Sequence, residues 1–71
     1  MSLKYPMYLS PRERQVYRLI CGEGLTNPEI AQRIGITAET VKTHTSKILL
    51  KRMVKSRVEL VVKHYTEAKA A

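Results

Sequence analysis

Residues 26–47 read TNPEIAQRIGITAETVKTHTSK, and this stretch decides the fold. Thr26 and Glu29 form a capping box, in which a hydroxyl and a carboxylate satisfy free backbone N–H groups, so a helix begins beside them. Gly35 follows where a helix ends in a left-handed residue, and Thr37 is the N-cap of the next helix. Two short helices joined by so tight a turn cross steeply. The stretch therefore predicts a helix-turn-helix motif.

Apolar residues stand where such a crossing needs them. Ala31 is small enough for the two helices to approach, and Ile30, Ile36 and Val41 can fix the angle between them. An ordinary helical hairpin is the alternative interpretation. That alternative gives no reason for the basic residues that follow the turn directly.

Further helices flank the motif on both sides. Ser10 and Glu13 form a capping box with Pro11 at the first helical position, and Ser56 and Glu59 repeat the pattern. We expect four helices, at about residues 11–21, 27–34, 38–52 and 57–68. The predicted class is all-α, a four-helix bundle with a central helix-turn-helix, in a domain spanning 9–68 between an N-terminal extension (1–8) and a C-terminal tail (69–71).

Apolar residues at helical spacing predict the core. The stripes are Val16, Leu19 and Ile20; Ile30, Ala31 and Ile34; Val41, Ile48 and Leu49; and Val58, Val61, Val62 and Tyr65. Cys21 reads as a small buried hydrophobe. Leu60 and His64 flank the last stripe, so we expect them at the surface, where they could meet a partner helix.

The charge is concentrated in one segment. The chain carries a net charge of +7, and residues 39–57 hold six Lys and Arg against the single acidic residue Glu39. Such a distribution favours a polyanionic partner. With Val41, Ile48 and Leu49 facing inward, the helix at 38–52 turns short and basic side chains outward, and these are our expected base contacts: Lys42, Thr43, Ser46 and Lys47. His44 lies beside this face and is interpreted as a hydrogen-bonded packing residue.

Several spaced motifs together resemble one known family. The runs LSPRERQV at 9–16, GLTNPEIA at 24–31, TVKTH at 40–44 and KSRVEL at 55–60 are similar to the LuxR-type (GerE/NarL-like) helix-turn-helix domain of bacterial transcription factors. The resemblance implies transcriptional regulation, base contacts at Lys42, Thr43 and Ser46, and weak dimers on DNA through the last helix, at Leu60 and His64. It places phosphate contacts at Thr26, Asn27, Thr37, Thr40, Lys55 and Arg57.

Two residues depart from the family pattern. The family usually has an apolar residue where Arg52 stands and a small or turn-forming one where Met53 stands. We therefore expect Leu50 and Met53 to replace the usual packing at the end of the third helix, which would leave Arg52 free for phosphate.

Other functions are disfavoured by what the sequence lacks. There is no aspartate, so a Ser-His-Asp triad is excluded, and one Cys with two His cannot close an ordinary zinc site. We expect no enzyme, no cofactor and no membrane span, and a cytoplasmic location with double-stranded DNA and RNA polymerase as partners. The alternatives are a promoter-binding domain like region four of sigma factors, and a protein-interaction module that does not bind DNA.

Overall fold

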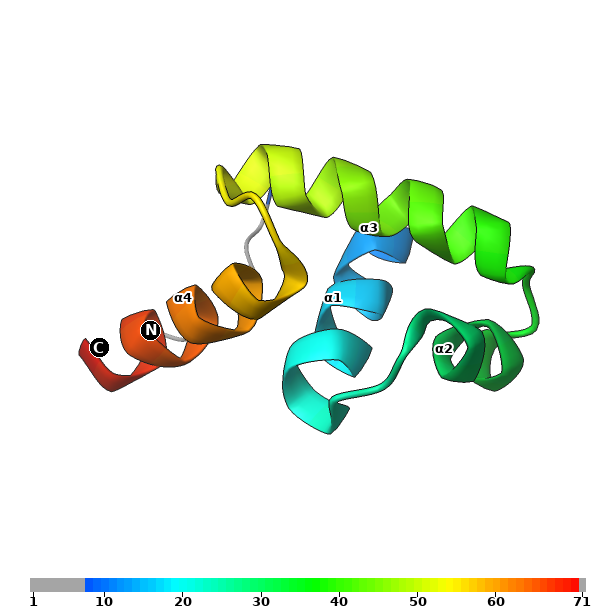
Figure 1. The fold of residues 1–71 in the computed structure, drawn as a ribbon, viewed down its shortest axis with the longest axis horizontal. Helices are drawn as coiled ribbons and strands as arrows, with labels where there is room; N and C mark the ends of the chain where they lie inside the picture. Colours follow the sequence, from blue (N-terminus) through cyan, green and yellow to red (C-terminus); the bar gives the residue numbers. More distant parts are fainter. Residues whose placement is uncertain (1–7, 71) are drawn as a thin grey trace.

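The computed structural model describes residues 8–70, which form four helices (Figure 1). They are α1 (Pro11–Glu23), α2 (Asn27–Ile34), α3 (Ala38–Arg52) and α4 (Arg57–Ala70). The predicted all-α class is confirmed. The second and third helices have the predicted bounds, whereas α1 continues past Gly22 and α4 runs two residues further than expected.

The helix starts follow from side chains that accept backbone hydrogen bonds. Ser10 and Glu13 form a complete capping box at α1, and Thr26 and Glu29 form another at α2. At α3 the Thr37 side chain accepts the backbone N–H of Thr40. These contacts are local in sequence, which is why the starts could be predicted.

The start of α4 departs from the predicted box. Ser56 Oγ accepts the N–H of Glu59, as expected. The Glu59 carboxylate, however, accepts the N–H of Lys55 instead of that of Ser56. The carboxylate thus holds the loop before the helix as well as the first turn.

Three helices end in a left-handed residue. Gly24 ends α1 with φ 68° and Gly35 ends α2 with φ 74°, where the absence of a Cβ makes the conformation cheap. Met53 ends α3 with φ 60°, although it is not glycine. A side chain in this region costs roughly 1–2 kcal/mol.

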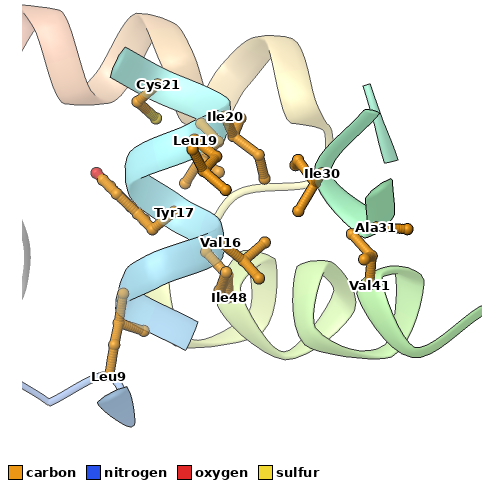
Figure 2. Close-up of a cluster of buried hydrophobic side chains, with 11 residues drawn as sticks. Leu9, Val16, Tyr17, Leu19, Ile20, Cys21, Ile30, Ala31, Val41 and Ile48 are labelled. Carbon is orange, nitrogen blue, oxygen red and sulfur yellow. The ribbon is translucent and has the colours of Figure 1, made fainter. Parts of the chain in front are cut away.

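The core surrounds α1, which contacts each of the other helices. Figure 2 shows Val16 and Ile20 of α1 beside Ile30 of α2 and Ile48 of α3. Cys21 is buried, as predicted. In Figure 1, α3 runs along one side of the molecule while α1, α2 and α4 lie against its inner side, so the outer side of α3 is uncovered.

The predicted core face of α4 is wrong except at Val61, which is partly buried against the core. Val58, Val62 and Tyr65 are 71%, 58% and 51% exposed, whereas Leu60 and His64 are buried. Burying His64 is possible because the Tyr17 hydroxyl lies 3.1 Å from its Nδ1. A polar residue thus takes a core position, and the helix turns an apolar stripe to the solvent.

The expected arrangement at the end of α3 is also wrong. Arg52 is buried and hydrogen-bonds to Glu67 of α4 and, at 3.4 Å, to the Tyr8 hydroxyl, while its guanidinium lies 5.9 Å from the Tyr17 ring centroid. Arg52 is therefore not free for phosphate. Leu50 and Met53 are exposed, so they do not take over the packing that the family usually has at the end of this helix.

Candidate nucleic-acid interface

The two faces of α3 differ sharply in chemistry. Residues 41, 45, 48 and 52 are buried against the rest of the fold. The side chains expected to contact bases are all exposed on the other face: Lys42, Thr43, Ser46 and Lys47. Their spacing of one and four residues places them in one stripe along the helix. The structure therefore brings these four together.

Within this stripe the Thr43 hydroxyl is already engaged. It donates to the backbone carbonyl of Glu39 at 3.2 Å, one turn back in the same helix. A hydroxyl has a single hydrogen, so Thr43 offers its methyl group and its oxygen lone pairs to a partner. A methyl group is suited to the C5-methyl of thymine.

Two threonine hydroxyls at the start of α3 are hydrogen-bonded to each other. Thr37 Oγ1 accepts the N–H of Thr40, and the two hydroxyl oxygens are 2.9 Å apart. One hydroxyl hydrogen is used in this bond, so one of the two remains for an outside acceptor. Both residues are exposed.

The residues at the start of α2 have different partners. The backbone N–H of Thr26 donates to the Glu29 carboxylate. This hydrogen bond lowers the pKa of Glu29 below its usual value. Asn27 is half-buried, and its Oδ1 accepts from Arg57 at 2.9 Å. Arg57 is half-buried as well, so it is less accessible than the exposed Lys55.

The six cations of residues 39–57 fall into two groups. Lys51 pairs with the buried Glu13 at 2.7 Å, Arg52 pairs with Glu67, and Arg57 bonds to Asn27. The bond from Lys51 is the main reason that the pKa of Glu13 lies below its usual range. The remaining three make no ion pair or side-chain hydrogen bond within residues 8–70: Lys42, Lys47 and Lys55.

The two residues predicted at a dimer contact, Leu60 and His64, do not lie at the surface. Leu60 and His64 belong to the interior, where desolvation lowers the pKa of His64. The exposed stripe of α4 consists instead of Val58, Val62 and Tyr65. The sequence does show apolar residues on two faces of α4, but this pattern does not tell which face packs against the rest of the fold.

His44 lies beside the exposed stripe of α3 and is half-buried. Its packing position agrees with the prediction, but the expected hydrogen bond is not found: Nδ1 is buried and has no partner among the described residues. Within the same part of the chain, no helix is long and apolar enough to cross a membrane, and no three His, Cys, Asp or Glu residues could together hold a metal ion.

Comparison of the sequence with known proteins identifies the family of this chain. The family model of bacterial regulatory proteins of the luxR family matches residues 7–64, which include all of α1, α2 and α3. The chain belongs to the LuxR family of bacterial regulatory proteins. It is accordingly a DNA-binding domain of transcription regulation, as the sequence predicts, and the sigma-factor alternative is not needed.

Relatives with this LuxR-type domain are regulators from several bacteria. The chain is 50% identical over 54 residues to the nitrate/nitrite response regulator protein NarL of Escherichia coli, covering 76% of this chain and 24% of that protein. It is 43% identical over 54 residues to the two-component response regulator PprB of Pseudomonas aeruginosa, covering 76% and 19%. It is 44% identical over 54 residues to the response regulator protein VraR of Staphylococcus aureus, covering 76% and 25%. The chain thus spans a quarter or less of the length of these relatives.

Proposed function

We propose that this LuxR-type domain reads a DNA sequence by inserting α3 into the major groove. The observation that supports this most is the exposed stripe of Lys42, Thr43, Ser46 and Lys47, whose residues face away from the core. A helix of 15 residues is about 22 Å long, and the major groove is about 12 Å wide, so the helix can lie in the groove with several side chains at base edges.

The flanking contacts position the helix on the phosphate backbone. Thr37 and Thr40 at the start of α3 can donate one hydroxyl hydrogen between them, and Lys55 carries an open positive charge beyond its end. Thr26 and Asn27 at the start of α2 supply a second set of donors. Contacts of this kind fix register without reading the bases.

We further propose that two copies meet on DNA through α4. The stripe of Val58, Val62 and Tyr65 is apolar, exposed and aligned at intervals of four and three residues. Such a small patch cannot offset the cost of association by itself, so the dimer forms on DNA, with half-sites about one helical turn apart.

The relatives indicate a wider setting for the domain. Three of them are named response regulators, so we propose that this chain is the DNA-binding part of a longer regulator. Its partners are then double-stranded DNA and RNA polymerase, in the cytoplasm. Its role there is binding and not catalysis.

Two kinds of substitution separate reading from positioning. Thr43→Ala removes the methyl group together with the hydroxyl and should relax the preference at one base pair, where a mismatch costs roughly 1–3 kcal/mol, while leaving the salt dependence unchanged. Thr43→Val keeps the methyl group and should retain most of that preference. Lys55→Ala should weaken binding to target and scrambled duplexes equally and reduce the salt slope by about one.

The measurement is the affinity of each variant for target and scrambled duplexes over a series of salt concentrations. If Lys55→Ala changed the base preference while Thr43→Ala did not, the wrong face of α3 would have been placed in the groove.

A further inference from the structure

Three helices meet at the side chain of Asn27. It occupies the first position of α2, while Arg57 begins α4 and Thr45 lies in the middle of α3. The Asn27 Oδ1 accepts from Arg57 Nη1 at 2.9 Å and lies 3.5 Å from the Thr45 hydroxyl. Thr45 donates its hydrogen over the shorter distance, 2.9 Å, to the carbonyl of Val41. Arg57 is therefore the main donor to the Asn27 oxygen.

This contact fixes which way the carboxamide is turned. A guanidinium has only N–H donors, so the atom facing it must be the oxygen of Asn27 and not the nitrogen. The Nδ2 group then points elsewhere. It makes no hydrogen bond with the described residues and is not among their buried unpaired atoms, so it is open to the solvent.

Arg57 itself is poorly placed to touch DNA. Its Nη2 is buried and has no partner among the described residues. Desolvation lowers the pKa of Arg57, in keeping with a guanidinium turned into the fold. A phosphate could reach this atom only if the side chain left Asn27.

We propose that Arg57 is a positioning residue: it holds the Asn27 carboxamide so that Nδ2 donates to a DNA phosphate, and it does not contact the phosphate itself. This inference rests on the proposed function, because it names how one of the proposed phosphate contacts is oriented. It also ties the start of α4 to the DNA-facing start of α2. In this proposal Asn27 contacts the phosphate, and Arg57, which was expected to do so, does not.

A double-mutant cycle tests the proposal. Arg57→Gln and Asn27→Ala should each weaken binding to the target duplex about fivefold, the effect of one lost hydrogen bond. The double variant should be no weaker than the weaker single variant, because both substitutions remove the same contact. The salt slope of Arg57→Gln should equal that of the unsubstituted chain.

Lys55→Gln is the matched control, since it removes one positive charge two residues away. Its effect should add to that of Asn27→Ala, and its salt slope should fall by about 0.9. If Arg57→Gln behaved like Lys55→Gln in both respects, the positioning role would be overturned. If the unsubstituted chain showed no preference for any duplex, the proposed function itself would fail, so the two failures are distinguishable.

Thermal melting without DNA shows whether each variant is folded at the assay temperature. If Arg57→Gln is not, the unsubstituted chain still supplies a test, in the nuclear magnetic resonance signals of the Asn27 Nδ2 hydrogens. These signals should shift when the target duplex is bound. Signals that stay in place at saturation would overturn the proposal.

Discussion

At the scale of single residues, Met53 is the residue with the least favourable backbone. It ends α3 with φ 60°, and its side chain is 85% exposed, so little packing compensates for the left-handed conformation. Met53→Gly should therefore raise the free energy of unfolding by about 1 kcal/mol. Denaturant unfolding of the two proteins measures the difference.

A matched control is available at the other left-handed caps. Gly24→Ala places a side chain where φ is 68° and should lower the free energy of unfolding by a similar amount. If Met53→Gly were destabilising, the exposed methionine would have to make a stabilising contact that the geometry does not show.

At the scale of elements, the position of α4 depends on a buried polar cluster. Tyr17 of α1 contacts His64, Arg52 of α3 pairs with Glu67, and the Tyr65 hydroxyl donates to the carbonyl of Cys21. Burial raises the pKa of Tyr17 to about 12, so its hydroxyl stays protonated in neutral solution. The contacts of His64 and Glu67 lie on the same face of α4 as the buried Leu60, and this face is the one that is covered.

The cluster makes stability depend on pH in a predictable direction. Desolvation lowers the pKa of His64 below its ordinary value of 6.5, and the nearby Arg52 lowers it further, while Glu67 opposes both. The unfolded chain therefore binds a proton at His64 more readily than the folded chain does. Stability contributed by the neutral imidazole is present above about pH 6.5 and is lost as the pH falls below it.

The measurement is the denaturant midpoint between about pH 8 and about pH 5.5, where carboxylates contribute little. The midpoint should fall toward the lower pH, and the fall should be smaller in His64→Gln, because glutamine at position 64 does not titrate. An equal fall in both proteins would show that His64 is not its cause.

The elements also show how far sequence could predict the structure. The starts of α1, α2 and α3 could be predicted, because capping residues act on backbone groups three positions away. The covered face of α4 could not, because His64 is buried through a contact with Tyr17, 47 residues away in the chain. The exposed stripe of α3 could be predicted from periodicity, whereas the partner of Arg57 lies 30 residues away and could not.

At the scale of the whole molecule, the exposed stripe of α4 should act only when two copies are bound. Val62→Glu should weaken binding to a duplex with two half-sites about tenfold, because a charge would enter an apolar contact. A duplex with one half-site is the control, because Val62→Glu should bind it as the unsubstituted chain does. If Val62→Glu bound the two-site duplex as tightly as the unsubstituted chain, α4 would not be the contact between copies.

The distribution of charge over the molecule leads to the most direct test. Of the six cations in residues 39–57, three are held by other groups of the chain, and Lys42, Lys47 and Lys55 have no side-chain partner among residues 8–70. If Lys42 and Lys47 displace counterions from the groove as Lys55 does at the phosphates, the three cations correspond to a slope of about −2.7 in the logarithm of the binding constant against the logarithm of the salt concentration. All six would double that value.

The measurement is the affinity of the purified chain for a duplex bearing a single half-site selected from random sequences, and for a scrambled duplex, over a series of salt concentrations. The account predicts a slope near −2.7 on both duplexes and a preference of at least about thirtyfold for the selected one, the lower bound for two base contacts of about 1 kcal/mol each. Equal affinity for the two duplexes, or binding that does not depend on salt, would contradict it.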